Sequence, residues 1–402
     1  MRKLVEENKI YPKKLLENLN AASIRCEFLW REAKQKDKFS IVSDALKSLF
    51  ILVREKAKRR GGWLGKSPYE ALIDIYTPGL KVETVDVVFN ELKNKLPSII
   101  SKLNKENYIS HKAINLKEAY KFDEIAKKIA TEMGFVFHNG RIDTSTHPFC
   151  GGHFEDVRIT HSYGGNNFIS SLYAVIHETG HGVYEQNLPV KWHSQPIGQA
   201  CGCAAHEASA LLYEFFLGKS KYLLGRINKI ISKYVAKYTK ETLLNEIKKI
   251  QLNNSIRIDA DVVTYPLHVI LRYELEKLLF DGTLQIEDIP EYWKQKHEEL
   301  LGFKLRSDAD GCLQDIHWYM GLLGYFPSYG IGLIYAAQMY YLFGFHKLQG
   351  VKDFKQKFCN LAKNFYAHGS LSEFESLVQK CTRKELDVSH YYKFINSEYL
   401  NK

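Results

Sequence analysis

The sequence has 402 residues, of which 45% are hydrophobic and 25% are charged, and these are values of a folded globular protein rather than a disordered one. This length is enough for one large hydrophobic core or two lobes. The net charge is +10, but the densest basic run, from Arg54 to Arg60, lacks any nucleic-acid-binding motif, so a solvated helix face is the simpler interpretation.

The cysteines and the N-terminal stretch predict a cytoplasmic protein. Seven cysteines lie at scattered positions, which is not the pattern of a disulfide framework. No signal-like apolar stretch follows Met1. Residues 316–346 contain no Asp, Glu, Lys or Arg and could cross a bilayer, but their glycines, proline and tyrosines favour a buried wall of the active site.

Apolar residues recur with helical spacing along most of the chain, which predicts a mainly α fold. The clearest amphipathic stretches are expected as helices at 122–133, 168–186, 198–216, 223–234, 267–280 and 354–365.

Residues 134–163 are the exception to this helical pattern. Asn139-Gly140 lies between Phe135-Val136-Phe137 and Arg141-Ile142-Asp143 and predicts a β-hairpin. Residues 157–163 then predict a strand that leads into helix 168–186. We therefore expect one large helical domain over 1–402, with a helical part at 1–134 and a catalytic part at 135–402 that holds a small antiparallel β-sheet beside helix 168–186.

Helix 168–186 carries the sequence His177-Glu178-Thr179-Gly180-His181. Two histidines four residues apart lie one turn apart on a helix and can bind one metal ion. The carboxylate of Glu178 projects beside that ion, where it can accept a proton from a bound water. Paired histidines can also be ordinary surface or core residues, so a third ligand is needed to favour a metal site.

Glu207 is the preferred third ligand. A glutamate from a later helix would complete a His2Glu set and leave the fourth position open for water. Residues 199–205, just before His206-Glu207, are mostly small and let two helices approach closely. Glu185, one turn beyond His181, is the alternative, although a carboxylate outside the metal coordination is the simpler interpretation for it.

Several blocks of the sequence resemble one known family, the thermostable carboxypeptidase Taq family of zinc metallocarboxypeptidases. Its family members are usually longer, and this chain is expected to begin inside their N-terminal helical region. The similarity runs over nearly the whole chain, and its blocks are His147-Pro148-Phe149, Asp156-Val157-Arg158-Ile159-Thr160, the helix from His177 to Gln186, Ile256-Arg257 with Ala260-Asp261, and Gly311 to Trp318 followed by Gly324-Tyr325-Phe326-Pro327.

The resemblance implies a broad-specificity zinc enzyme that releases single amino acids from peptide C-termini. His177, His181 and Glu207 would bind one Zn2+, for which Co2+ could substitute, and Glu178 would be the general base. The resemblance implies peptide substrates with a free C-terminus and a possible homodimer, and we expect neither a nucleic-acid nor a membrane partner.

Further site residues are drawn from the same blocks and, for Tyr329, from the residues just after the last of them. A donor side chain is needed to stabilise the oxyanion, and the candidates are His147, His317, Tyr325 and Tyr329, each of which could instead be a buried residue with satisfied hydrogen bonds.

A terminal carboxylate calls for an arginine, because the guanidinium group gives two parallel hydrogen bonds. Arg257 and Arg158 are the candidates, and either could instead be a structural ion-pair partner. Asp156 and Gln314 are predicted to help bind the substrate. Strand 157–160 is expected to bind the peptide backbone by edge pairing.

Two alternative functions stay open. The chain could be a zinc oligopeptidase in which the arginines serve structure. It could also be a catalytically weak peptide-binding relative that lost an N-terminal lid, although the intact His177, Glu178, His181 and Glu207 argue against this.

Overall fold

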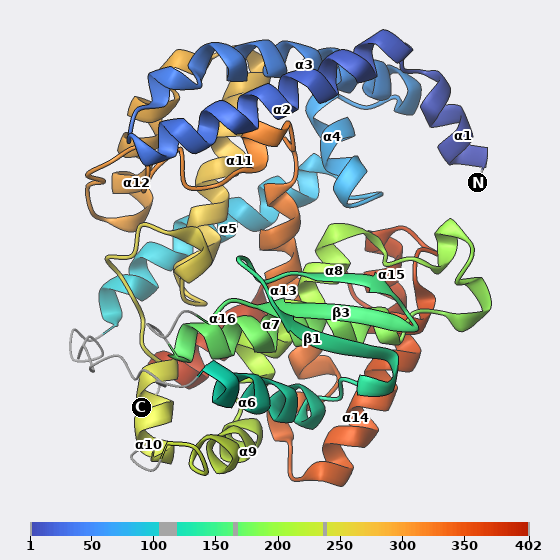
Figure 1. Ribbon diagram of the computed structural model, residues 1–402, viewed down its shortest axis with the longest axis vertical. Helices are drawn as coiled ribbons and strands as arrows, with labels where there is room; N and C mark the ends of the chain where they lie inside the picture. The colour runs from blue at the N-terminus through green and yellow to red at the C-terminus, as the bar shows by residue number, and fades with distance from the viewer. Residues whose placement is uncertain (1, 104–118, 164–167, 236–238, 401–402) are drawn as a thin grey trace. The chain divides into compact units, whose positions relative to one another are not determined.

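The computed structural model describes residues 2–103, 119–163, 168–235 and 239–400, and it is mainly helical as predicted (Figure 1). The chain divides into two compact units. Unit 1 comprises Met1–Lys102 and Gln251–Gly330, and unit 2 comprises Leu103–Ile250 and Ile331–Lys402. The single-domain organisation with a boundary at residue 134 stays a prediction.

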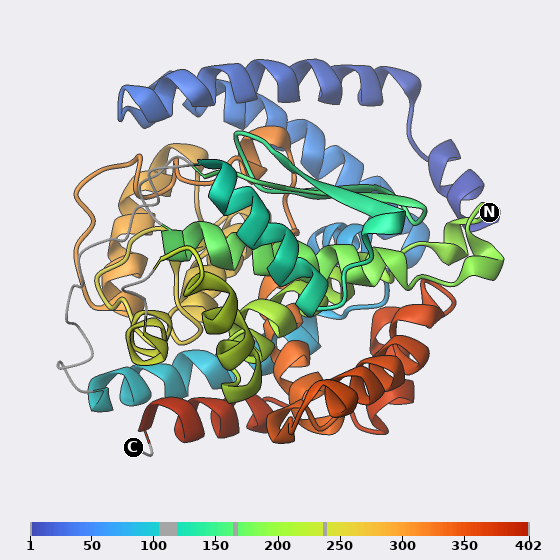
Figure 2. The same ribbon diagram turned by 60° about the horizontal axis from the view of Figure 1, so that its bottom comes forward.

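The described residues of unit 1 form helices and the turns between them, and no strand. Helices α2 and α3 run side by side in both views (Figures 1 and 2). Its helices are α1 (Arg2–Lys9), α2 (Lys13–Gln35), α3 (Ser43–Leu64), α4 (Pro68–Tyr76), α5 (Val82–Lys102), α11 (Tyr265–Asp281), α12 (Ile289–Leu301) and the first residues of α13 (Phe326–Leu342).

The basic run from Arg54 to Arg60 lies inside α3. Arg60 is buried and donates hydrogen bonds to Asp74 at 2.8 Å and to Glu7 at 2.7 Å. A buried guanidinium needs such carboxylate partners to offset its lost hydration. This arginine therefore joins α1, α3 and α4 rather than forming part of a solvated face.

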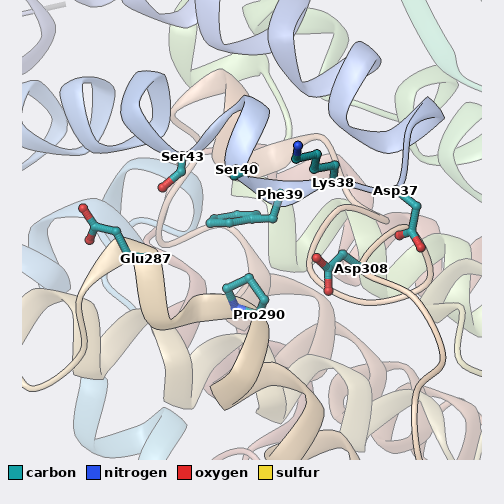
Figure 3. Close-up of a pocket in the computed structure, with 8 residues that line it drawn as sticks. All are labelled: Asp37, Lys38, Phe39, Ser40, Ser43, Glu287, Pro290 and Asp308. Carbon is teal, nitrogen blue, oxygen red and sulfur yellow. The ribbon is translucent and has the colours of Figure 1, made fainter.

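A hollow of about 400 Å³ lies on the surface of unit 1 (Figure 3). The buried ring of Phe39 forms part of its wall, with Asp308 and Glu287 at the rim. Asp308 is paired with Lys294 at 2.9 Å and Glu287 with Lys47 at 2.6 Å. Because lysines of the same unit already neutralise these carboxylates, we assign no binding function to the hollow.

Residues 316–346 include a 3-10 turn, helix α13, whose side chains are largely buried, and the start of a second 3-10 turn. None of the helices in the part of the chain that the structure describes is long and apolar enough to cross a bilayer.

Unit 2 contains the remaining helices and a three-stranded sheet. Helix α7 has the bounds predicted for it. The helices are α6 (Ala119–Glu132), α7 (Phe168–Gln186), α8 (Gly202–Leu211), α9 (Lys221–Ile231), α10 (Lys240–Ile247), α14 (Val351–Asn364), α15 (Phe374–Thr382) and α16 (Ser389–Ile395), and the strands are β1 (Gly140–Thr144), β2 (Cys150–His153) and β3 (Asp156–His161).

The sheet differs from the prediction, because its strand order is β1-β3-β2 and β1 pairs with β3 in parallel. Only β2 is antiparallel to β3, so the sheet is mixed. The predicted hairpin at Asn139-Gly140 is wrong, since 137–139 form a 3-10 turn. A Cβ atom on Gly140 would lie 2.2 Å from the Val157 carbonyl oxygen, so this glycine allows close strand approach rather than a turn.

The edge-pairing prediction for strand 157–160 is also wrong. Strand β3 is central, and its two edges are hydrogen-bonded to β1 and β2. A peptide cannot add to a strand whose edges are both occupied.

Helix α7 packs tightly against α8 at Gly180. The Ser209 hydroxyl donates a hydrogen bond of 2.8 Å to the Gly180 carbonyl oxygen. A Cβ atom on Gly180 would lie 2.7 Å from the Ala210 Cα atom. On its other side α7 faces the sheet, and a Cβ atom on Gly182 would lie 3.0 Å from a methyl carbon of Ile159 (Figures 1 and 2). Gly180 and Gly182 therefore allow α7 to lie close to α8 and to the sheet.

Gly180→Ala is expected to lower the free energy of unfolding by about 1–3 kcal/mol, because the new methyl group meets backbone atoms that cannot turn aside. Urea denaturation measures the change. Gly225→Ala is the matched control, since a Cβ atom there meets nothing within 4 Å in helix α9. The control should be neutral or stabilising by up to about 1 kcal/mol. Equal effects of the two substitutions would contradict the close α7–α8 contact.

Candidate active site

His177, His181 and Glu207 converge in unit 2. The two histidines come from α7, and Glu207 comes from the buried face of α8. The Nε2 atoms of His177 and His181 lie 4.0 Å and 3.7 Å from Glu207 Oε2. One ligand atom from each residue lies within 4.8 Å of the other two. The cluster that the sequence predicted is therefore formed.

These separations suit a metal ion. Two ligand atoms, each about 2.1 Å from a tetrahedral metal, lie about 3.4 Å apart. The observed histidine–carboxylate distances are slightly longer and exceed hydrogen-bonding range, so the three groups surround a space instead of closing on one another. Two imidazoles and one carboxylate are also the donor set of many catalytic zinc sites.

Glu178 lies beside this cluster and is buried, with 7% of its surface exposed. Its Oε2 atom has no hydrogen-bond partner among the described residues. Burial raises the pKa of the Glu178 carboxyl to about 7, against the lowering effect of His177, and the Glu207 carboxylate adds to the rise. A carboxyl group with such a pKa can both accept and release a proton near neutral pH.

Two carboxylate–histidine pairs flank the cluster, and neither pair was predicted from the sequence. Glu214 Oε2 lies 2.7 Å from His177 Nδ1, and Glu185 Oε1 lies 2.8 Å from His206 Nε2. Burial alone would lower the pKa of His177, but the Glu207 and Glu214 carboxylates outweigh it and raise the value to about 10. The available signal for Glu214 was its spacing of seven residues, two helical turns, from Glu207.

The remaining predicted residues of unit 2 lie on or near the sheet. Arg158 donates a 2.6 Å hydrogen bond to Asp156 on the same strand, and both side chains are about half exposed. His147 is exposed, and its carbonyl oxygen accepts a hydrogen bond from the Thr160 hydroxyl. Their catalytic and binding roles stay predictions.

Arg257 belongs to unit 1 and is buried in an ion-pair cluster. Its guanidinium group lies 2.9 Å from Asp315 and 4.6 Å above the Tyr329 ring. Arg272 binds the second oxygen of Asp315. Burial alone would raise the pKa of Asp315, but the two arginines hold it far below its usual value. Arg257 therefore already has a structural partner.

His317, Tyr325 and Gln314 lie in the same unit as Arg257. His317 Nε2 lies 3.2 Å from the Tyr329 hydroxyl, and its ring contacts Tyr325. Burial lowers the pKa of His317 to about 4, so its imidazole is neutral at pH 7. The Gln314 amide accepts a hydrogen bond from the Arg257 backbone N–H. Unit 1 holds these residues and unit 2 holds the metal cluster, and their participation in one site stays a prediction.

A helix with the His-Glu-x-x-His pattern and a glutamate from the next helix, in a mainly helical protein, defines the class: a metallopeptidase. The family model described as carboxypeptidase Taq (M32) metallopeptidase matches residues 1–399. The chain belongs to this family. It is a metallocarboxypeptidase, a hydrolase that acts on peptide bonds, and the family implies a divalent metal and peptide substrates.

Individual relatives agree with this assignment. Carboxypeptidase 1 of Bacillus subtilis (strain 168) is 32% identical over an alignment of 416 positions, which covers 100% of this chain and 82% of that protein. Thermostable carboxypeptidase 1 of Pyrococcus furiosus is 30% identical over 97% of this chain and 80% of its own length. The structure of Trypanosoma cruzi metallocarboxypeptidase 1 matches with a TM-score of 0.91 and 32% identity, covering 97% of this chain and 81% of that one.

Proposed function

We propose that this protein is a zinc carboxypeptidase that removes C-terminal residues one at a time from peptides, with broad specificity. The convergence of His177, His181 and Glu207 in unit 2 carries this proposal. These residues would hold Zn2+, or Co2+ in its place, and the ion would supply Lewis-acid polarisation and an acidified water. We also propose that the protein is cytoplasmic and forms a homodimer.

Glu178 is the proposed general base. Its buried carboxylate would accept a proton from the attacking water and pass the proton to the departing amine. Its burial beside the cluster, and an Oε2 atom that has no hydrogen-bond partner among the described residues, support this role.

The side chains around the substrate are proposed from the sequence blocks. His317, His147 or Tyr325 would donate a hydrogen bond to the oxyanion. The neutral imidazole of His317 can act as such a donor through one ring N–H. Arg257 or Arg158, with Asp156 and Gln314, would hold the terminal carboxylate of the peptide.

An oligopeptidase is the second candidate function. It is favoured by one observation, the pairing of both candidate arginines with carboxylates of their own unit, Arg257 with Asp315 and Arg158 with Asp156. In that case neither arginine would select a free C-terminus, and internal peptide bonds would be cut.

Removal of the metal is expected to abolish hydrolysis, and one equivalent of Zn2+ should restore it. His181→Ala should weaken zinc binding by more than about a hundredfold, which is the upper range for loss of a residue that only supports a ligand. Competition with a coloured chelator measures the affinity. His138→Ala removes an exposed histidine of the same unit and is the control. Unchanged zinc affinity in the His181 variant would contradict the ligand assignment.

A further inference from the structure

Glu214 Oε2 lies 2.7 Å from Nδ1 of His177, within hydrogen-bonding distance of one histidine of the cluster. We infer that Glu214 is a positioning residue of the metal site, which fixes the ring of His177 and strengthens it as a ligand. The inference rests on the proposed function, because it takes His177 as a metal ligand.

The hydrogen bond determines which nitrogen of His177 carries the proton. A carboxylate accepts only, so Nδ1 holds the hydrogen and donates it to Glu214. In the neutral form of the ring that would bind a metal, the lone pair then lies on Nε2, the atom that faces Glu207 across 4.0 Å. Histidine ligands generally show this arrangement, in which a carboxylate behind the ring fixes the tautomer and makes the ligand nitrogen more basic.

Helix α7 packs against α8 and against the segment that continues α8. This packing places Glu214 behind the ring of His177. The two segments run antiparallel, since Glu185 meets His206, Gly180 meets Ser209 and His177 meets Glu214. Glu214 itself lies in a π-helical turn, Leu212–Leu217, that continues α8. Such wide turns are rare and are frequently found at functional sites.

The neighbouring pair, Glu185 with His206, offers a matched comparison. The two glutamate side chains are similarly exposed, at 20% for Glu214 and 26% for Glu185, and each bonds one imidazole nitrogen at nearly the same distance. His206 is stacked on His181 with ring centroids 4.3 Å apart, but it is not one of the three clustered ligands. Only the Glu214 pair acts directly on a proposed ligand.

The test compares Glu214→Gln, Glu214→Ala and Glu185→Gln for zinc affinity, by competition with a coloured chelator. Glutamine keeps an acceptor but loses the charge, so Glu214→Gln should weaken binding by about tenfold. Glu214→Ala loses both and should weaken it by about a hundredfold. Glu185→Gln should stay within about threefold of the unaltered protein. The visible spectrum of the Co2+-loaded protein should change in the Glu214 variants and stay the same in Glu185→Gln.

Unchanged zinc affinity in Glu214→Ala, or an equal loss in Glu185→Gln, would overturn the inference. The unfolding midpoint in excess chelator shows whether each variant is folded, and if the alanine variant is not, the nearly isosteric Glu214→Gln decides. The proposed function has a separate outcome. If the unaltered protein binds zinc no better than His177→Ala does, then the metal site itself is wrong, whatever Glu214 contributes.

Discussion

Glu178→Gln is expected to lower turnover by about a hundredfold or more while the protein keeps its metal. Glutamine has nearly the shape of glutamate but cannot accept the proton of the attacking water. The buried position of Glu178 beside the cluster also leaves little room for bulk water to take over that proton. Steady-state hydrolysis of a short peptide, with the metal content of each sample measured, gives the comparison.

Glu185→Gln is the matched control for this substitution. Glu185 lies two turns further along the same helix and is hydrogen-bonded to His206. Its change to glutamine alters the charge of α7 equally but removes no proposed base. Near-normal turnover of a zinc-loaded Glu178→Gln protein would eliminate Glu178 as the base.

Amidation of the C-terminus of a peptide substrate is expected to reduce its cleavage by roughly thirtyfold to several thousandfold. This range corresponds to about 2–5 kcal/mol for a charge-assisted bidentate hydrogen bond that is left unmade, with the arginine left unpaired. The ratio of kcat/KM for the free acid and the amide measures it. Acetylation of the N-terminus of the same peptide changes the charge at the other end and should have little effect.

The responsible arginine should lose its preference for the free acid when it is changed to methionine. Arg158→Met is a mild change, because that side chain is about half exposed. Arg257→Met removes a buried partner of Asp315, so the folded state of this variant must be checked by its unfolding midpoint. If the unaltered protein cleaves acid and amide peptides equally, the oligopeptidase function is the better account.

The helices could be predicted because their signal is local. The apolar face of 168–186 is contained in one stretch of sequence, and α7 has these bounds. The sheet could not be predicted in the same way. The parallel pairing of Gly140 with Val157 joins residues seventeen positions apart, and Asn139-Gly140 has a hairpin signal that the tertiary approach of β1 to β3 overrides.

The same distinction applies to the site. His177, Glu178 and His181 are positioned by one helix, so their spacing alone predicted their arrangement. Glu207 needed the further argument that small residues bring α8 close to α7, and the contact of Gly180 with Ala210 shows that approach. The pairing of Glu214 with His177 depends on the antiparallel register of two segments and on a π-helical turn. Neither is visible in a single sequence.

In the proposed reaction, the protein removes single residues from the C-terminus of peptides with the help of a metal ion held by His177, His181 and Glu207. Mass spectrometry of a short unmodified peptide, sampled over time with the zinc-loaded protein, tests it most directly. We expect a ladder of products that shorten one residue at a time from the C-terminus, and this ladder should be lost after chelation and in Glu178→Gln. Internal cuts without a ladder, or a ladder that persists in excess chelator, would contradict it.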